Sequence, residues 1–296
     1  MLLTKSVRSA SLSLLLFCAP AITFYLVFMF YPLLSAFFYS LTDWNGLFRT
    51  YNMVGLSNYI EAFTKDARFH HALSYTFRYV IAIVTIENVL ALMIAMLVEN
   101  RRKAKGLFRT LFFMPNILSI YIGSLMWLFI FTRIFPQIAE RSVFTFLDQA
   151  WLGDKNLSFY SILIVALWQS TGYLMIIYIA AIQGVPSDLM EAAVIDGANG
   201  FQRFLHITLP LIMPAITVCL FLTLNSSFKI FDSVMALTKG GPGYATEVIA
   251  LNVYYEGFKS NKRFGYATAK SIILFFIILA VTVVQVTATK KREVEL

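Results

Sequence analysis

The chain has 296 residues, of which 59% are hydrophobic and only 14% are charged, whereas charged residues make up about 25% of a typical soluble domain. This composition excludes an ordinary soluble domain and indicates a protein that crosses a membrane several times. The net charge of +8 comes largely from short basic runs at the ends of apolar segments, which predicts orientation in a bilayer and no binding to nucleic acid. Cys18 and Cys219 both lie within apolar runs, so neither a disulfide nor a metal site is expected.

Six apolar runs reach the ~20 residues that a helix needs to cross a bilayer. The first run is far longer than the core of a secretory signal, so we expect it to remain as the first span. Prolines in or beside the runs predict kinks, because neighbouring helices or water can satisfy the carbonyl groups that proline leaves unpaired. The sequence therefore predicts an all-α, six-helix transmembrane protein, with spans over Leu12–Tyr39, Leu73–Val98, Leu107–Phe131, Phe159–Ile182, Leu211–Phe228 and Thr268–Thr289.

Three basic clusters fall on one side of the membrane if the chain crosses it six times. Lys5 and Arg8 precede the first span, residues 101–109 link the second span to the third, and residues 290–292 follow the sixth. Lysine and arginine collect on the cytoplasmic side of membranes, so we expect both termini there. Lysines between spans five and six weaken this bias without reversing it.

The second span contains two charged residues, Arg78 and Glu87. At about 1.5 Å per residue they lie roughly 13 Å apart along a helix, which is too far for direct pairing. Glu87 lies deeper, where a carboxylate is costly and is therefore a candidate for function. An ion-driven secondary carrier would use such a group, but no second carboxylate or histidine in the spans continues a proton relay. A structural contact of Glu87 with another helix or a partner is the preferred interpretation.

The fourth span carries Trp168, Gln169 and Tyr173. An aromatic face with an amide beside it suits the apolar face of a sugar ring and its hydroxyl groups, so Gln169 and Tyr173 are candidates for a solute path. The alternative is an aromatic belt at the membrane interface, which fits Trp168 better.

Residues 187–210, between spans four and five, form a polar stretch that we call the connecting segment. Ser187 indicates a helix start, with negative charge following in the first turn. Gly197 and Gly200 stand where the helix needs a residue of positive φ, and a second helical piece is expected to follow and to end at Pro210. Such a bent helix pair at the membrane surface is either a docking surface for a partner or an ordinary amphipathic connector.

Polar residues interrupt the outer end of the fifth span. Asn225, Lys229 and Asp232 are spaced by four and three, so on a continuous helix they share one face, with Ser226 beside them. That face could hydrogen-bond a hydroxyl-rich solute. The alternative is an ion pair between Lys229 and Asp232 at the membrane edge.

Motifs for catalysis and for ATP binding are missing from the sequence. No G-x-x-x-x-G-K-[ST] phosphate-binding loop occurs, and the glycine-rich residues 240–243 lack the following Lys-Ser/Thr. No metal-binding histidine pair and no serine nucleophile with a histidine in a span is present. We therefore expect a chain without catalytic residues, metal or cofactor, and any ATP to be hydrolysed on another protein.

Several stretches taken together resemble the permease subunits of bacterial ATP-binding-cassette importers. The connecting segment is similar to their EAA signature, through Glu191-Ala192-Ala193, Asp196-Gly197-Ala198 and Ile207-x-Leu209-Pro210. Two other stretches resemble the sugar-type members, the maltose and glycerol-phosphate permeases. They are Thr42-Asp43-Trp44 with Val54-Gly55-Leu56-x-Asn58-Tyr59, and Leu237-Thr238-x-Gly240-Gly241-Pro242.

The resemblance implies the type I importer permease fold in the bacterial inner membrane and import of a carbohydrate by alternating access. It implies four protein partners besides membrane lipid: a second homologous permease, two ATPase subunits and an extracytoplasmic solute-binding protein. The residues expected to couple the chain to an ATPase are Glu191, Ala192, Ala193, Asp196, Gly197, Leu209 and Pro210. The expected organisation is an N-terminal span with an extracytoplasmic segment (1–71), a core of five spans containing the connecting segment (72–289), and a cytoplasmic tail (290–296).

Overall fold

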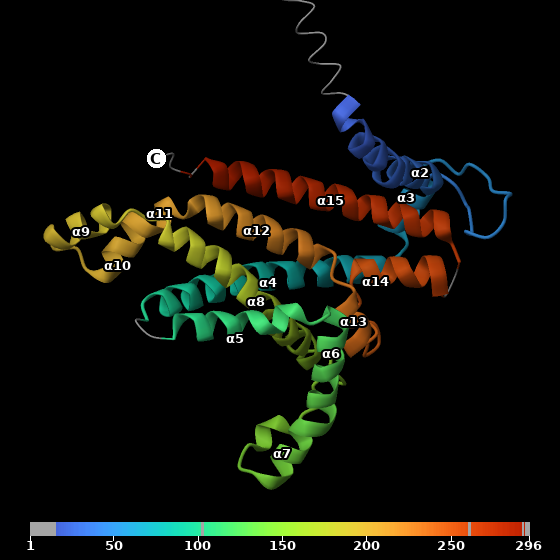
Figure 1. The fold of residues 1–296 in the computed structure, drawn as a ribbon. Helices are drawn as coiled ribbons and strands as arrows, with labels where there is room; N and C mark the ends of the chain where they lie inside the picture. Colours follow the sequence, from blue (N-terminus) through green and yellow to red (C-terminus); the bar gives the residue numbers. More distant parts are fainter. Residues whose placement is uncertain (1–15, 102–103, 260–261, 292, 294–296) are drawn as a thin grey trace, which may run out of the picture. The chain divides into compact units, whose positions relative to one another are not determined.

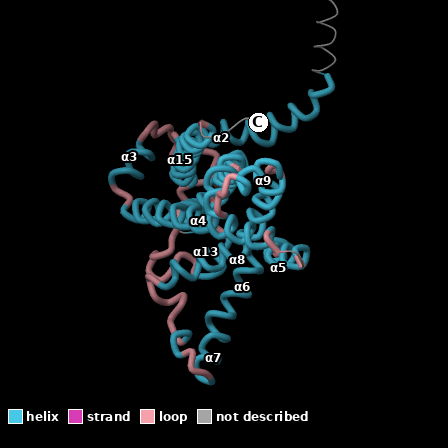
Figure 2. The backbone as a smooth tube through the Cα atoms, turned by 90° about the vertical axis from the view of Figure 1, so that its left-hand side faces the viewer, coloured by secondary structure: helices cyan, strands magenta, loops and turns pink. Residues whose placement is uncertain are grey.

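The computed structural model describes residues 16–101, 104–259, 262–291 and 293. Apart from one isolated β-bridge between Thr42 and Met53, these residues form helices joined by turns and loops (Figure 2), as the sequence predicts. The chain divides into two compact units, residues 1–65 with 253–273 and residues 66–252 with 274–296. The basic residues Lys5, Arg8, Arg102, Lys103 and Arg292, the first four residues of the first predicted span and most of the predicted tail lie outside the described residues.

The first unit contains the apolar helix Leu16–Ser40, whose last part is α2 (Tyr31–Ser40), together with the short helix α3 (Ser57–Thr64). The side-chain amide of Asn58 donates to the carbonyl oxygens of Ser40 and Thr42, at 2.8 and 2.9 Å. These bonds hold α3 against the end of α2. They also account for the buried asparagine in α3, because its amide has both of these partners.

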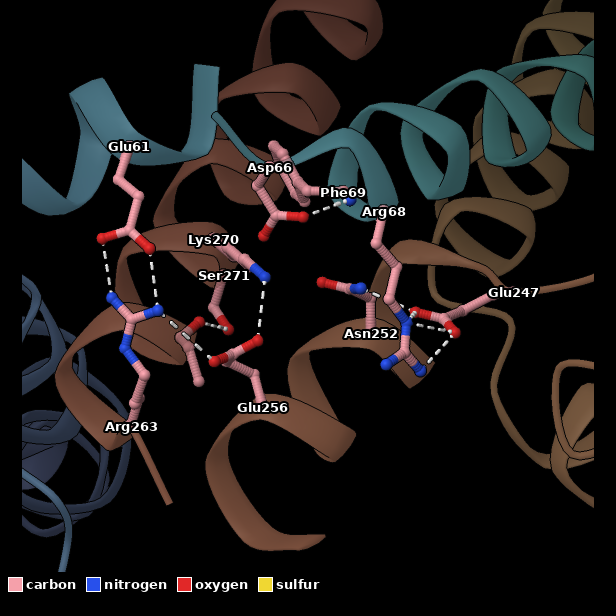
Figure 3. A network of polar contacts seen from close by, with 11 residues as sticks. Glu61, Asp66, Arg68, Phe69, Glu247, Asn252, Glu256, Arg263, Lys270 and Ser271 are labelled. Atoms are coloured by element: carbon pink, nitrogen blue, oxygen red, sulfur yellow. Dashed lines mark hydrogen bonds and ion pairs between the residues drawn. The ribbon is translucent and has the colours of Figure 1, made fainter. Parts of the chain in front are cut away.

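The start of α15 (Phe264–Lys290) also belongs to the first unit. The N–H of Gly265 donates to the carbonyl oxygen of Trp44 at 2.7 Å, and a Cβ at Gly265 would collide with the carbonyl oxygen of Thr42. Arg263 reaches both carboxylate oxygens of Glu61 at 2.7 Å (Figure 3). Close backbone approach and this bidentate ion pair together join α15 to α3 and to the loop after α2.

Helices α4 (Ala67–Glu99) and α8 (Leu157–Gln183) form the centre of the second unit. Helix α5 (Lys105–Ile117) packs on α8, and α12 (Met213–Phe228) packs on α4. Figure 1 shows α4, α8 and α12 running side by side. Apolar side chains from these three helices fill the core between them, namely Ala91, Ala95, Val98, Leu174, Met175, Tyr178, Ile179 and Cys219.

A polar tie runs through this core. The hydroxyl of Tyr178 donates to Oδ1 of Asn88 at 2.8 Å, and Nδ2 of Asn88 donates to the hydroxyl of Thr223 at 3.2 Å. The tie joins α8, α4 and α12 through side chains that are all buried. Because each of these buried polar groups has a partner, their hydrogen bonds offset the cost of desolvation while they fix the register of the three helices.

Helices α5 and α8 approach each other closely at Gly172. A Cβ at this position would collide with the carbonyl group of Phe112. Only glycine leaves room for the backbone of α5 there, as small residues do at many contacts between membrane helices.

The remaining elements of the second unit extend from its ends. Helix α6 (Ile120–Phe129) packs against α13 (Asp232–Leu237), and the chain beyond α6 leads away from the core helices and returns (Figure 1). The elements of this excursion are η2 (Ile130–Ile134), α7 (Phe135–Arg141) and η3 (Thr145–Leu147).

The stretch between α13 and α14 (Ile249–Tyr254) is fastened to the start of α4 by a buried ion pair. Glu247 is fully buried and accepts hydrogen bonds from Nε and Nη2 of Arg68, at 2.6–2.9 Å, and from the amide of Asn252 at 2.6 Å (Figure 3). The guanidinium of Arg68 also lies 3.9 Å from the ring centroid of Tyr244. The glycine-rich turn at 240–243 thus belongs to an anchored loop.

Within the described residues, five helices are long and apolar enough to cross a membrane, and the pair Gly200–Leu211 and Met213–Phe228, bent by 70°, makes a sixth if it is one span. The third predicted span, Leu107–Phe131, is wrong in its bounds. Helix α5 continues through Pro115 and ends at Ile117, Leu118 is extended, and the next span runs from Ile120 to Arg141. Where a kink at Pro115 is expected, the helix therefore breaks three residues later, at Leu118 and Ser119.

Candidate functional site

The connecting segment begins with α9 (Ser187–Ile195), at the predicted residue. Gly197 has a φ of 81° and turns the chain, which also agrees with the prediction. The expectation of positive φ at Gly200 is wrong. Gly200 is the first residue of α10 (Gly200–Arg203), which Asn199 caps by accepting from the N–H of Gln202 while the Gln202 side chain accepts from the N–H of Asn199. A π-helical turn (Phe204–Thr208) and α11 (Leu209–Leu211) complete the segment.

The residues of the EAA resemblance lie at the surface of this segment. Glu191, Ala192, Asp196 and Gly197 are exposed, and Ala193 is half-buried. A hollow of about 380 Å³ lies between the two helical pieces. Its lining includes three of the predicted residues, and consists of Ala193, Asp196, Gly197, Ala198, Gln202, Arg203, His206 and Ile207.

Large apolar side chains are exposed on the same segment. Ile195 is 85% exposed and Phe201 is 71% exposed. Leu209 and Pro210 are half-buried at the point where the segment joins α12. A concave, partly charged surface with exposed apolar side chains has the character of a protein-docking surface more than that of a plain connector.

A polar cluster joins the ends of α4, α5 and α8, just before the connecting segment begins. The carboxylate of Glu99, at the end of α4, accepts from Nζ of Lys105 at 2.7 Å, Nη2 of Arg109 at 3.0 Å and the amide of Gln183 at 3.2 Å. Gln183 is the last residue of α8. The ends of α4, α5 and α8 nearest the connecting segment therefore meet at one carboxylate.

A cavity of about 250 Å³ lies further along the same helices. The residues that surround it come from α4, α5, α6, α8, α12, α13 and the turn between the last two. They are Tyr79, Ile83, Glu87, Asn116, Ile120, Ala166, Gln169, Ser170, Ser226, Ser227, Lys229, Ile230, Phe231, Asp232 and Ser233. Polar and charged groups in such a cavity between apolar helices mark a candidate path for a solute.

Four of the six residues predicted for the solute path line this cavity: Gln169, Ser226, Lys229 and Asp232. Tyr173 does not line it and is 43% exposed on α8. Asn225 does not line it either, and its amide donates to the carbonyl oxygen of Phe221 in its own helix.

The expected single helical face is wrong. Helix α12 ends at Phe228, Lys229 is its C-cap, and Asp232 is the first residue of α13. Lys229 instead borders the cavity from the turn after α12, and Asp232 borders it from the start of α13. Both side chains are exposed, and in the described part of the chain no ion pair joins them.

Glu87 also lines the cavity, although the sequence favoured for it a structural contact with another helix or a partner. It is only 4% exposed and borders the cavity together with Ser170 on α8, whose hydroxyl donates to the carbonyl oxygen of Ala166 at 2.8 Å. Tyr79, Ile83 and Glu87 are spaced by four, which places them on one helical face and was the available signal. The described residues contain no group of three or more His, Cys, Asp or Glu side chains that could hold a metal ion.

Comparison with known proteins identifies a relationship over most of the chain. Residues 87–292 match the family model described as "Binding-protein-dependent transport system inner membrane component". The probable starch degradation products transport system permease protein AmyD of Thermoanaerobacterium thermosulfurigenes is 40% identical over 95% of both chains. The multiple sugar-binding transport system permease protein MsmF of Streptococcus mutans is 36% identical over 90% of this chain and 92% of its own.

The fold is also similar to that of a solved structure. A chain in the crystal structure of a bacterial ABC transporter involved in the import of the acidic polysaccharide alginate superposes with a TM-score of 0.82. It covers 98% of this chain and 99% of its own, at 20% sequence identity. This likeness concerns the fold and is independent of the sequence match.

Proposed function

The chain belongs to the family of inner membrane components of binding-protein-dependent transport systems, and from this premise we propose that it is one of two permeases that together form the path for a carbohydrate. Relatives that share 36–40% of its residues are named for the transport of starch degradation products and of multiple sugars. The observation that carries the proposal is the continuity of the connecting segment with α8 and α12, both of which line the cavity.

Transport by alternating access needs energy from outside this chain, because its sequence has no phosphate-binding loop. We propose that an ATPase pair binds the connecting segments of the two permeases and moves them when it closes. Glu191, Ala192, Ala193, Asp196 and Gly197 would contact the ATPase, with Leu209 and Pro210 joining the segment to the membrane. A short helix joined directly to α8 suits this role, since a force applied to it moves the adjoining spans as units.

The proposed orientation places both termini and the connecting segment in the cytoplasm of a bacterial cell. The basic clusters at 101–109 and 290–292 support this orientation. An extracytoplasmic binding protein would then deliver the solute at the opposite ends of α4, α8 and α12. The cavity, about midway along α4 and α8, would receive the solute, and the chain itself would need no cofactor.

The test is reconstitution of the chain in liposomes with its partner permease, ATPase subunits and solute-binding protein. The expected result is ATP hydrolysis stimulated by a particular carbohydrate and uptake of that carbohydrate. If no carbohydrate changes the rate of ATP hydrolysis or enters the liposomes, the proposal is wrong.

An ion-driven carrier that uses Glu87 is the alternative, and the same liposomes distinguish the two. A carrier would take up solute with the chain alone under a proton or sodium gradient. The importer requires the ATPase subunits, and an ion gradient does not replace them.

A further inference from the structure

Helix α3 in the first unit has a buried face and an exposed apolar face. Asn58 and Ala62 are buried against the rest of the unit, at 6% and 0% exposure. The N-cap residue Leu56 is 65% exposed, Ile60 is 59% exposed and Phe63 is 53% exposed. Because these three residues are spaced by four and three, they form one apolar stripe along the helix.

An exposed polar face lies beside this stripe. Ser57 and Thr64 are exposed, and each follows a residue of the stripe by one position, which is about 100° round a helix of ~3.6 residues per turn. The helix therefore turns one side to the protein, one apolar side outward and one polar side outward. A helix that lies in the plane of a membrane surface, with acyl chains on one side and water on the other, has this pattern.

Hydrogen bonds fix α3 at the level where two membrane spans end. The amide of Asn58 donates to the carbonyl oxygens of Ser40 and Thr42, at the end of α2. Glu61 accepts from both Nη1 and Nη2 of Arg263, directly before α15 begins (Figure 3). The end of one span and the start of another mark the boundary of the hydrocarbon layer, so α3 lies at that boundary.

Aromatic side chains gather at the same boundary. The ring centroid of Trp44 lies 4.3 Å from that of Tyr39, 5.2 Å from that of Phe264 and 6.4 Å from that of Tyr51. Tryptophan and tyrosine are enriched at the level of the lipid headgroups, because their rings combine an apolar body with a polar group. The loop between α2 and α3 therefore has the composition of a membrane interface.

We propose that α3 is an interfacial helix, whose stripe of Leu56, Ile60 and Phe63 inserts among the acyl chains of the lipid leaflet beside the end of α2. The occupant of this apolar face is lipid, and neither the solute-binding protein nor a second permease covers it. The proposal requires that the chain spans a membrane but no particular solute or energy source. It therefore stands or falls independently of the proposed function.

The test measures the surroundings of a nitroxide label on α3 in the full chain, in liposomes of phosphatidylcholine. Cys18→Ser with Cys219→Ser is the starting variant, so that each later variant has one cysteine. Ile60→Cys reports on the stripe, and Ser57→Cys and Thr64→Cys are the controls on the polar face of the same helix. Collisions of the label with oxygen, which dissolves in acyl chains, are compared with collisions with a water-soluble nickel complex.

The label at residue 60 is expected to favour oxygen, and the labels at residues 57 and 64 are expected to favour the nickel complex. Adding the partner permease and the solute-binding protein should leave these preferences unchanged. The proposal is overturned if both faces show the same preference. It is also overturned if an added protein shields the label at residue 60 from both reagents, because that protein is then the occupant of the stripe.

Discussion

The ion pair between Arg68 and Glu247 gives a quantitative test of how the loop between α13 and α14 is held. Glu247 is fully buried, whereas the side chain of Arg68 is 33% exposed. In Arg68→Ala the buried carboxylate keeps only the amide of Asn252 among the partners shown for it. Removing one member of a buried ion pair lowers the free energy of unfolding by about 3–5 kcal/mol, because the other charge stays buried without its partner. The partial exposure of Arg68 favours the lower end of this range, about 3 kcal/mol.

The reverse substitution is expected to be milder. Glu247→Gln keeps the shape of the side chain and leaves Arg68, which can turn its guanidinium toward water, at a loss of about 1–2 kcal/mol. The double variant should be more stable than Arg68→Ala alone, because Glu247→Gln removes the stranded charge. This order differs from that of two independent contacts, whose losses would add.

The assay is thermal unfolding of the purified chain in detergent at one heating rate. On the order of 2–4 °C per kcal/mol, Arg68→Ala should lower the midpoint by about 6–12 °C. Arg133→Ala serves as the control, because Arg133 is an exposed arginine for which the described residues show no acidic partner, and it should change stability by less than about 0.5 kcal/mol. A double variant as unstable as the sum of the single ones would refute the reasoning.

Three other predictions follow from single residues. Gly172→Ala should destabilise the chain by about 1–3 kcal/mol, because its Cβ collides with the carbonyl of Phe112. Gly106→Ala on the neighbouring α5 is the control and should not destabilise the chain, because a Cβ there meets nothing within 4 Å. Midpoints of thermal unfolding compare the two variants. Glu191→Lys or Gly197→Pro should abolish sugar-stimulated ATP hydrolysis and uptake without preventing membrane insertion, and parental uptake rates in either variant would contradict the role of the connecting segment. Hydrogen bonds from the N–H and side chain of Asn52 lower the pKa of Asp43 in the folded chain. The stabilisation that these bonds give the 43–52 loop is therefore fully present above the unfolded-state pKa of about 3.9. It is lost as the pH falls through the lower pKa of the folded state. Proteolysis of this loop should therefore rise only in acid, and Asp43→Asn should remove that dependence.

The sequence predicts most of the spans because a helix that crosses a bilayer needs about 20 mostly apolar residues, and such runs are visible in the sequence itself. It fails at the third span because apolar residues continue up to Leu118 and resume at Ile120, so hydropathy does not mark the break at Leu118 and Ser119. Pro115 and the N-cap residue Ser119 are local signals, but prolines in membrane helices are compatible with either a kink or a break. Burial of the freed carbonyl groups by neighbouring helices decides between them, and a single sequence does not contain that information.

The connecting segment is easier to predict from the sequence than the cavity, because its structure depends on local signals. Its helix start, directly after Pro186 and with Asp188 in the first turn, and the positive φ of Gly197 follow from local chemistry that acts within a few residues. The cavity depends on which faces of α4, α8 and α12 meet. The side chains of α8 are apolar nearly all round, so no polar face distinguishes Gln169, which lines the cavity, from Tyr173, one turn further on.

The positions of the two candidate regions on shared helices determine how one can act on the other. From Gln169 to Gln183 is 14 residues of continuous helix, or about 21 Å at ~1.5 Å per residue, so a displacement at the connecting segment is transmitted along α8 to the cavity. The contact at Gly172 and the tie of Tyr178, Asn88 and Thr223 oblige α5, α4 and α12 to move with α8. The part of the cavity lining that can still change its position is then the non-helical turn that carries Lys229, between α12 and α13. If the connecting segment drives transport, this turn must move relative to Glu87, and spin labels on Lys229 and a core position of α4 should report a distance that changes when ATP binds.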